Sequence, residues 1–510
     1  MKKLISALLL LLCSWLQAQP KLAKVTILHW NDFHAANEPF SVTIRDTGAQ
    51  KDSSYLVGGI ASFLGYLNKE RNESPSPIVL NAGDDFQGTP ISSITFGRSQ
   101  IELMNIVRPD AMTLGNHEFD YGSERLRQAL GLARFPVISA NLFDVNLRRQ
   151  FVEPVRIVER NGIRIGVVGL THPRLETLVV RDSLVGVQML AIDSVLRAQI
   201  ERLKKENVDL IIALTHIGLE NDSLIAVHHP ELDVIVSGHD HTPLFAPIRI
   251  NRSIVVQAGT RGRWLGKLDL VVDTNGDSVQ AYSGRLIETR NADIVPDTRA
   301  AQKVEELLSS LRVVMNEVIG ELRTPWTRGH DRRREDSNVG NWQADVMRRY
   351  ARTAIAIQNS GGIRANLASG PVTVGDVWRL NPFGNHFVVF EVDGATLLSM
   401  LEFQVSTGMQ EWCHVAGVRY VFDSRRPKGE RIVAVEVEGK DLDRKARYSI
   451  VTNNYVAGNS VAHFGIDLKD AHLEPLPHLD RDVFIEEIRR QRIISSVKDG
   501  RIKDIAADQN

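Results

Sequence analysis

The sequence predicts an α/β protein with two domains. Before about residue 290, short runs of β-branched and aliphatic residues alternate with stretches whose apolar residues recur every three or four positions, for example residues 60–70 and 192–205. Such alternation is typical of helices packed on sheets. The length of 510 residues favours more than one domain, and 43% hydrophobic with 24% charged residues is ordinary for a globular protein.

Five short polar segments follow five of the predicted strands. The strands cover residues 25–28, 78–80, 112–114, 210–214 and 234–236. The segments after them read Asn31-Asp32-Phe33-His34, Gly83-Asp84-Asp85, Gly115-Asn116-His117-Glu118, Thr215-His216 and Gly238-His239-Asp240-His241. Side chains that follow adjacent strands converge on one edge of a sheet, so we expect a pocket of Asp, His and Asn side chains there. Such a pocket can hold two divalent cations that share one carboxylate.

Each segment taken alone has a simpler explanation. A single Asp or His in a loop is usually a turn residue, and His239-Asp240-His241 could be a solvated turn after a buried strand. However, the five segments contain five of the fifteen histidines, and each segment ends an apolar run. This repetition favours a functional site over five unrelated turns.

The order of these segments resembles that of the calcineurin-like metallophosphoesterases. The flanking residues narrow the resemblance to the secreted 5′-nucleotidase and UDP-sugar hydrolase family, through Phe86-Gln87-Gly88-Thr89-Pro90, Phe119-Asp120-Tyr121-Gly122, Gln257-Ala258-Gly259 and Leu265-Gly266. The resemblance covers nearly the whole chain after the first twenty or so residues. It implies a four-layer metallophosphoesterase β-sandwich flanked by helices, followed by a smaller α/β substrate-binding domain.

We therefore expect four segments along the chain. These are a signal peptide over residues 1–18, a metallophosphoesterase domain over 22–290, a linker and connecting helix over 291–324, and a 5′-nucleotidase C-terminal substrate-binding domain over 325–510. The linker starts in a polar stretch with Pro296. A stripe of apolar residues then predicts a helix over about residues 299–319 that enters the second domain.

The resemblance implies a ligand set for two divalent ions. The seven expected ligands are the bridging Asp84, then Asp32, His34 and His241 for one ion, and Asn116, His216 and His239 for the other. Imidazole, carboxylate and amide ligands together suit zinc, manganese, cobalt or iron better than calcium. The sequence leaves the choice among these four open.

His117 and Asp120 form a separate pair beside the expected ligands. Because Asn116 is expected to point to a metal, its neighbour His117 can face the substrate. In the family this histidine stabilises the transition state and the aspartate orients it, which is electrostatic catalysis at a developing phosphoryl charge. A structural alternative, in which Asp120 caps a following helix, is compatible with that role.

In the second domain the resemblance implies contacts with substrate. Arg364 follows a predicted strand and fits an arginine that holds substrate phosphate or carboxyl groups, and either Arg333 or Arg334 is expected to be a second one. Phe383 fits an aromatic residue that stacks on a base, although a lone phenylalanine is more often part of a core.

The sequence departs from the family near its end. The usual Gly-Gly-Asp-Gly turn is absent from residues 458–464. We expect Phe464 to supply the second stacking face and Tyr455 to be structural. The base and sugar preference of the pocket is therefore left open.

The first residues predict export. Lys2 and Lys3 precede a short apolar run over residues 4–12, and Leu16-Gln17-Ala18 resembles a signal-peptidase site. The run is shorter than the ~20 apolar residues that cross a bilayer, so we expect no transmembrane segment. A periplasmic or secreted protein is expected. A lipoprotein anchored through Cys13 is an alternative, but Leu12 stands where a small residue is usual.

These observations predict an exported dimetal phosphohydrolase. It would act in nucleotide catabolism as a 5′-nucleotidase, releasing phosphate from nucleoside 5′-phosphates by attack of a metal-activated water. Hydrolysis of UDP-sugars or 2′,3′-cyclic nucleotides is an alternative within the family, and a non-catalytic surface binding protein is an alternative outside it. The net charge of −1 argues against a nucleic acid polymer as partner. The oligomeric state is not predicted.

Overall fold

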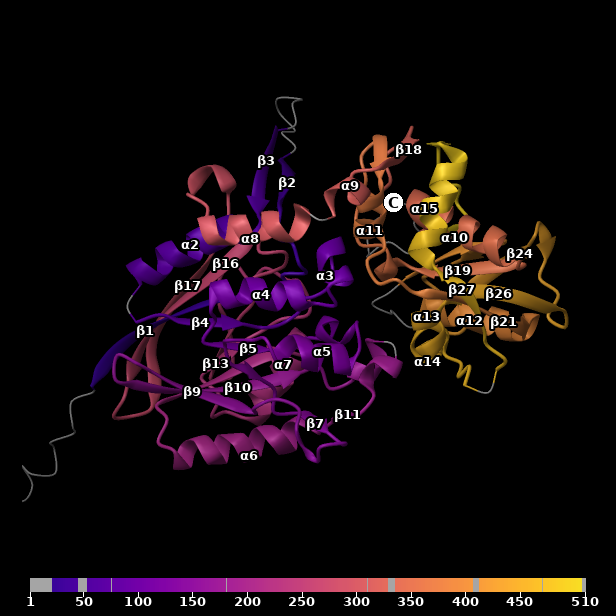
Figure 1. The fold of residues 1–510 in the computed structure, drawn as a ribbon. Helices are drawn as coiled ribbons and strands as arrows, with labels where there is room; N and C mark the ends of the chain where they lie inside the picture. The colour runs from indigo at the N-terminus through magenta and orange to yellow at the C-terminus, as the bar shows by residue number, and fades with distance from the viewer. Residues whose placement is uncertain are drawn as a thin grey trace, which may run out of the picture.

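The computed structural model describes residues 21–44, 53–74, 76–179, 181–309, 311–328, 335–406, 412–469 and 471–506. The expected signal peptide over residues 1–18 lies outside the described residues. The chain forms two bodies that lie side by side, coloured indigo to rose and orange to yellow in Figure 1. No helix in the described ranges has the length and apolar character needed to cross a membrane.

Two six-stranded sheets pack face to face in the first domain (Figure 1). The first sheet runs in the order β17 (Ser278–Glu288), β16 (Trp264–Asp273), β1 (Leu22–Trp30), β4 (Ile78–Asn81), β5 (Ala111–Thr113) and β6 (Val137–Ile138). The second runs β14 (Ile248–Ile250), β15 (Ser253–Val256), β13 (Val234–Val236), β12 (Leu210–His216), β10 (Ile163–Thr171) and β9 (Val155–Arg160). Ile27 and Leu80 of the first sheet share one core with Ile165 and Val234 of the second. This core is the centre of the domain.

Helices cover the outer face of each sheet. On the first sheet these are α2 (Ile60–Glu73), α4 (Arg98–Val107), α5 (Ser123–Leu130) and α8 (Thr298–Ser309), and on the second α6 (Ile192–Lys205) and α7 (Leu219–His228). The strands between them read as apolar runs because both of their faces are covered. All four residues of β4 and all seven of β12 are buried. The predicted four-layer sandwich is confirmed.

Shorter elements complete the first domain. They are the hairpin β2 (Pro39–Ile44) and β3 (Ser53–Gly58), the sheet of β7 (Leu142–Asp144), β8 (Arg149–Gln150) and β11 (Val187–Met189), helix α3 (Pro90–Ile94), and the 3₁₀ turns η1 (His117–Phe119), η2 (Leu175–Thr177), η3 (Arg181–Leu184) and η4 (Asn291–Asp293). The turn η1 matters most for the site because it starts at His117.

The second domain is built on a five-stranded mixed sheet. Its order is β22 (Cys413–Ala416), β19 (Ile355–Asn359), β26 (Arg447–Asn453), β21 (His386–Asp393) and β27 (Glu474–Leu479). One face packs against α10 (Asn338–Ala351), α11 (Val374–Leu380) and α15 (Asp480–Gln491), and the other against α12 (Gly394–Ser406), α13 (Asn454–Gly458) and α14 (Ser460–Phe464). Side chains alternate along β19, because Ala356 lies in the first of these cores while Ile355 and Ile357 lie in the second.

Two small sheets flank this domain. One contains β20 (Gly370–Thr373), β18 (Val318–Leu322) and β28 (Ile493–Ile494). The other contains β25 (Lys440–Asp441), β24 (Ile432–Val437), β23 (Val418–Phe422) and β29 (Ile502–Asp504). A 3₁₀ turn, η5 (Ser360–Gly362), directly follows the central strand β19. The second domain is therefore a mixed α/β unit, as expected.

The prediction of one connecting helix over residues 299–319 is wrong. Helix α8 ends at Ser309, α9 covers only Arg312–Met315, and the chain then enters strand β18. The apolar residues Val304 and Leu307 of α8 pack on the first domain, against α2 and α4. Ile319 lies instead in the core of the second domain, where β18 pairs with β20. The apolar residues of this stripe therefore pack into two different cores. Their spacing of three and four residues does not indicate where one core ends and the other begins.

Candidate metal centre and substrate cavity

The five polar segments meet at one end of the sandwich. Strands β1, β4 and β5 are parallel neighbours in the first sheet, and β12 and β13 are parallel neighbours in the second. The seven expected ligands lie at or just after the carboxyl ends of these strands: Asp32, His34, Asp84, Asn116, His216, His239 and His241. The site is thus assembled from both sheets.

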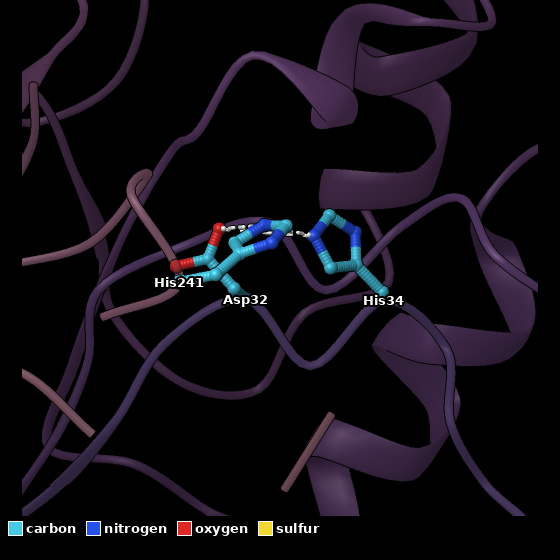
Figure 2. Close-up of side chains that lie close together, drawn as sticks. All are labelled: Asp32, His34 and His241. Atoms are coloured by element: carbon cyan, nitrogen blue, oxygen red, sulfur yellow. Dashed lines mark hydrogen bonds and ion pairs between the residues drawn. The ribbon is translucent and has the colours of Figure 1, made fainter. Parts of the chain in front are cut away.

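One group of ligands consists of Asp32, His34 and His241. Figure 2 shows these three side chains pointing toward one another. The Nε2 atoms of His34 and His241 lie 2.8 Å apart, and Asp32 Oδ1 lies 3.2 Å from the Nε2 of His241 and 3.7 Å from that of His34. Two imidazoles and a carboxylate in such close convergence are a typical arrangement around a divalent transition metal.

A second group surrounds Asp84. Its Oδ2 lies 3.0 Å from His216 Nε2, and His239 Nδ1 lies 3.0 Å from Asn116 Oδ1. Asp84, His216 and His239 place ligand atoms within 4.8 Å of one another. Asp84 also forms such a group with His34 of the first set and with His117. Asp84 is therefore positioned between the two groups, where a bridging carboxylate belongs.

Neighbouring polar groups orient these ligands. Asp32 Oδ2 accepts hydrogen bonds from Asn31 Nδ2 at 2.6 Å and from the backbone N–H of His239 at 2.9 Å. Its Oδ1 is buried and accepts no hydrogen bond from the residues that the structure describes, which leaves it available for a cation. His216 Nδ1 contacts the carbonyl oxygen of Ala82 at 2.7 Å, so Nδ1 carries the proton and Nε2 faces Asp84.

Five of the seven ligands have backbones in the left-handed region. The φ angles are +51° at Asp32, +50° at His34, +59° at Asp84, +91° at His239 and +57° at His241. Such conformations cost about 1–3 kcal/mol each in residues other than glycine, and they cluster where function requires a fixed side-chain direction. The fold therefore accepts local strain in order to point these side chains inward.

The electrostatics of the centre also fit cations. Burial acts to raise the pKa of Asp84, but His216 and His117 outweigh it and hold that pKa well below its usual range. Burial acts to lower the pKa of His216, but Asp84 and Asp32 raise it to about 10. The carboxylates are thus charged and lie among imidazoles that can be deprotonated by metal binding. The residues present fit two divalent ions.

Glu118 is a buried residue beside the centre to which the sequence alone assigns no role. Its carboxylate is fully buried and accepts four backbone N–H groups, from Gly115 at 2.6 Å, Asp85 at 2.7 Å, Asp84 at 3.0 Å and Phe86 at 3.2 Å. It therefore ties the loop after β4 to the loop after β5. The polar segment that contains Glu118 indicated a site there, but only the folded structure shows which backbone groups Glu118 binds.

His117 and Asp120 are paired as expected. His117 Nδ1 lies 2.8 Å from Asp120 Oδ2, and the backbone N–H of His117 donates to Asp84 Oδ1 at 2.8 Å. Burial acts to lower the pKa of His117, but the carboxylates of Asp120 and Asp84 raise it above its ordinary value. The imidazole is thus held next to Asp84 in a state that favours a positive charge.

The two domains share a cavity of about 430 Å³ beside this centre. From the first domain it is lined by Asp84, Asn116, His117, Asp120, Leu178, Val179, Ser183, His239 and His241. From the second it is lined by Arg328, Asn359, Ser360, Gly361, Gly362, Arg364, Phe383, Gly384, Asn385, Asn454 and Tyr455. One wall therefore carries the candidate metal ligands, and the other carries aromatic, amide and guanidinium groups.

Two of the predicted substrate residues face this cavity. The ring of Phe383 lies 5.8 Å from the ring of His117, and the Arg364 guanidinium lies 5.8 Å from the centre of the Phe383 ring. Arg333 and Arg334 lie outside the described residues. Arg328, which the sequence analysis did not select, lines the cavity in the same part of the chain.

The expectation for Phe464 is corrected by the structure. Its side chain is 1% exposed and belongs to the core of the second domain, so it presents no ring face to the cavity. Tyr455, expected to be structural, lines the cavity instead. The reason is geometric, because α13 starts at the rim of the cavity at Asn454 while α14 turns Phe464 inward against α12.

Known proteins share both halves of this arrangement. Residues 25–243 match the calcineurin-like phosphoesterase family model and residues 318–464 match that of the 5′-nucleotidase C-terminal domain. A 5′-nucleotidase of Diplobatis ommata is 32% identical over 506 residues, covering 89% of this chain and 85% of that protein. The chain belongs to the 5′-nucleotidase family.

Other members of the 5′-nucleotidase family agree with this assignment. The crystal structure of a 5′-nucleotidase precursor from Thermus thermophilus has a TM-score of 0.84 and 31% identity, covering 94% of this chain and 99% of that one. The trifunctional nucleotide phosphoesterase protein YfkN of Bacillus subtilis (strain 168) is 28% identical over 535 residues, and this chain spans 35% of that longer protein. Membership of the family makes the chain a phosphoester hydrolase.

Replacing the central carboxylate should empty the centre. In Asp84→Asn, an amide cannot supply the negative charge that holds two cations together, so we expect loss of bound metal and of nearly all phosphatase activity. Metal analysis after dialysis and phosphate release measure the two effects. The control is Asp85→Asn, the adjacent buried aspartate, which belongs to none of the ligand groups. Two metals retained in Asp84→Asn with full activity would contradict the bridging role.

Replacing Glu118 should loosen the centre without unfolding the domain. In the wild type, four backbone N–H groups donate to the Glu118 carboxylate. In Glu118→Gln the amide nitrogen carries N–H groups of its own and cannot accept these bonds, so the loops after β4 and β5 should separate. We expect metal affinity to fall by roughly 10–100-fold, as is usual when a group that orients ligands is lost. Competition with a chelator measures this. Glu124→Gln is the control, since Glu124 is exposed on the next helix; equal metal affinities in the two variants would refute the role of Glu118.

Proposed function

We propose that the protein is an exported 5′-nucleotidase that hydrolyses nucleoside 5′-phosphates with two divalent ions. The observation that carries this proposal is the shared cavity. One of its walls carries the candidate metal ligands, and the opposite wall carries two aromatic rings, Phe383 and Tyr455. A phosphate needs the first wall and a base needs the second. A nucleotide is a ligand that requires both at once.

The residues of the first domain divide the chemistry among them. When bound, two divalent cations would polarise the phosphoryl group and lower the pKa of a water molecule that attacks it. One ion would be held by Asp32, His34 and His241. The other would be held by Asn116, His216 and His239, and Asp84 would bind both ions. His117 would donate a hydrogen bond from Nε2 to a phosphoryl oxygen, because Nδ1 is engaged by Asp120.

The second domain would orient the nucleoside. The rings of Phe383 and Tyr455 offer stacking faces, and stacking of a base on an aromatic side chain tolerates any base. Asn359, Asn385 and Asn454 add amide donors and acceptors along the same wall. Arg364 lines the same wall, with its guanidinium over the Phe383 ring, and that ring lies 5.8 Å from the ring of His117. Arg364 is placed to contact the phosphate of a bound nucleotide.

Export is proposed from the N-terminal segment, residues 1–18, together with the resemblance to secreted enzymes. The amino-terminal sequence of the protein recovered from cell fractions tests it, and a protein that starts at Gln19 outside the cytoplasm is the expected result. Recovery of the intact chain from the cytoplasm would refute export.

A substrate panel tests the enzymatic part of the proposal. Phosphate release is measured from nucleoside 5′-phosphates, UDP-glucose, 2′,3′-cyclic AMP and p-nitrophenyl phosphate, each with zinc, manganese, cobalt and iron. We expect the highest kcat/KM for nucleoside 5′-phosphates. A higher value for UDP-glucose or the cyclic nucleotide would reassign the substrate within the family, and no hydrolysis with any metal would support a non-catalytic protein.

His117→Ala should separate catalysis from metal binding. Because His117 is expected to touch the phosphoryl group and not an ion, the variant should keep its metal content while kcat falls by ~10²–10³-fold, which is typical when one preorganised donor is removed. Metal analysis and steady-state kinetics measure this. Loss of metal from the variant would instead make His117 a ligand.

The pH profile gives a second measurement on the same pair. His117 acts as a donor only while protonated, so kcat should fall as pH rises through its pKa. The carboxylate of Asp120 raises that pKa. In Asp120→Asn the fall should therefore begin at lower pH than in the wild type. An unchanged alkaline limb would mean that this pair does not control the reaction.

Phe383→Ala and Arg364→Ala should distinguish nucleotides from simple esters. Both variants should raise KM for a nucleoside 5′-phosphate about tenfold, the loss of roughly one stacking or charge-assisted contact. Both should change hydrolysis of p-nitrophenyl phosphate much less, because that ester needs mainly the metal centre. Phe464→Ala is the control, since a core cavity should reduce stability and affect both substrates alike. Equal losses on both substrates in Phe383→Ala would remove the support for a base-stacking role.

A further inference from the structure

Two hydroxyl groups of the first domain lead to the loop of the second domain that carries Phe383. Tyr121 Oη donates to Ser93 Oγ at 3.2 Å, and Ser93 Oγ donates to the carbonyl oxygen of Pro382 at 3.1 Å. Ser93 is a buried residue of α3, whereas Pro382 directly precedes Phe383 in the chain. These hydrogen bonds therefore end on the peptide group that joins Pro382 to Phe383.

The direction of these hydrogen bonds follows from the chemistry of the groups. Burial raises the pKa of Tyr121 to about 12, so its hydroxyl keeps the proton and donates it. The Ser93 hydroxyl has a single proton, and the carbonyl oxygen of Pro382 can only accept. Because Ser93 accepts from Tyr121, its own proton is free to point to Pro382. Tyr121 thus orients the Ser93 hydroxyl toward the second domain.

A donor from the second domain reaches the same carbonyl oxygen. Arg481 is 7% exposed, its Nη1 donates to the carbonyl oxygen of Pro382 at 3.3 Å, and its guanidinium lies 3.5 Å from the centre of the Trp378 ring. Gly384 has a φ of +65°, and a Cβ atom there would lie 2.9 Å from Arg481 Nη2. The loop is therefore packed against Arg481 on both sides of Phe383.

The place of this loop matters because the Phe383 ring faces the reaction centre. The ring lies 5.8 Å from the ring of His117. Both residues line the shared cavity, but they belong to different domains, so their separation depends on contacts across the domain boundary. Ser93 lies in the same domain as His117 and supplies such a contact, directly next to Phe383.

We propose that Ser93 is a positioning residue for substrate selectivity, whose hydrogen bond to Pro382 fixes the Phe383 ring relative to the metal centre and so favours substrates that carry a base. This inference rests on the proposed nucleotidase function and deepens it. Ser93 does not line the cavity, so it acts through Phe383 and not by contact with the substrate. A substrate without a base gains nothing from the hydrogen bond.

Steady-state kinetics of the metal-loaded full chain test this inference with AMP and p-nitrophenyl phosphate. In Ser93→Ala, KM for AMP should rise about fivefold, the loss of one hydrogen bond between neutral groups. The kcat for AMP and both constants for p-nitrophenyl phosphate should change less than about twofold, because the metal centre is untouched. Ser93→Thr keeps a hydroxyl and should lie closer to the wild type than Ser93→Ala.

The matched control is Ser92→Ala. Ser92 is the neighbouring serine on α3 and is also buried, but it donates no hydrogen bond to the described residues of the second domain. Its kinetic constants for AMP should stay near those of the wild type. Constants for AMP in Ser93→Ala that match those of Ser92→Ala would overturn the inference, and so would equal losses on AMP and p-nitrophenyl phosphate.

A double-mutant cycle tests whether Ser93 acts through Phe383. If it does, adding Ser93→Ala to Phe383→Ala should raise KM for AMP less than about twofold further, because the ring that Ser93 positions is already gone. A further fivefold rise in the double variant would show that Ser93 acts independently of the ring, and the inference would be wrong. It would also be wrong if Phe383→Ala alone left KM for AMP unchanged.

The outcomes keep this inference apart from the function on which it rests. If the wild type hydrolyses no nucleotide, the proposed function fails, and crystal structures of Ser93→Ala and Ser92→Ala then decide the positioning role. Displacement of residues 382–384 in Ser93→Ala alone supports that role. The same position of these residues in both variants refutes it.

Discussion

The buried carboxylate of Asp84 is the group on which the rest of the site depends. It follows a strand of one sheet, lies 3.0 Å from His216 of the other sheet, and accepts the backbone N–H of His117. A charge in such a place is costly unless it is paired. The imidazoles around Asp84 offset part of the cost of burying its negative charge. Cations bound by the candidate ligands would offset more of it. The same carboxylate therefore contacts both sheets, both groups of candidate ligands and the backbone of His117.

Close packing around Asp84 leaves no room for a larger residue at the neighbouring position 115. A Cβ atom on Gly115 would lie 2.1 Å from Asp84 Oδ1, so this position requires a glycine. Glu118 then gathers the backbone N–H groups of both adjoining loops onto one buried carboxylate. The left-handed backbone of Asp84 is held by these contacts. Rigidity of this kind is what holds reactive groups in a geometry that suits the transition state rather than the free enzyme.

Chemistry and selectivity are divided between the two domains. The first domain holds the candidate metal ligands, whereas the second holds the rings and amides of the opposite wall. Among the described residues the two bodies are joined near the cavity by individual hydrogen bonds. They run from Ser93 Oγ to the carbonyl of Pro382, from Arg261 to the carbonyl of Arg364, and from Asn459 Nδ2 to the carbonyl of Val179. A boundary held by such single contacts allows the second domain to diverge in specificity while the metal centre keeps its geometry.

The sequence by itself determined the fold class and the order of the strands that carry the polar segments, because both are encoded locally. The choice of the seven candidate ligands within those segments came from the resemblance to the family. An apolar run marks a buried strand, and a polar segment directly after it marks the edge where side chains converge. The pairing of His117 with Asp120 was expected from the same resemblance, and the structure places His117 Nδ1 2.8 Å from Asp120 Oδ2. Only the tertiary structure decided which groups outside those segments take part. Tyr455 faces the cavity and Phe464 the core, although both are aromatic and close in sequence, because the orientation depends on how α13 and α14 pack. The apolar stripe after residue 299 was divided between two domain cores rather than continued as one helix. The hydrogen bond from Arg261 to the carbonyl oxygen of Arg364 joins groups distant in sequence and leaves no periodic signal. Contacts of this kind exist only once the chain has folded, so no local pattern can encode them.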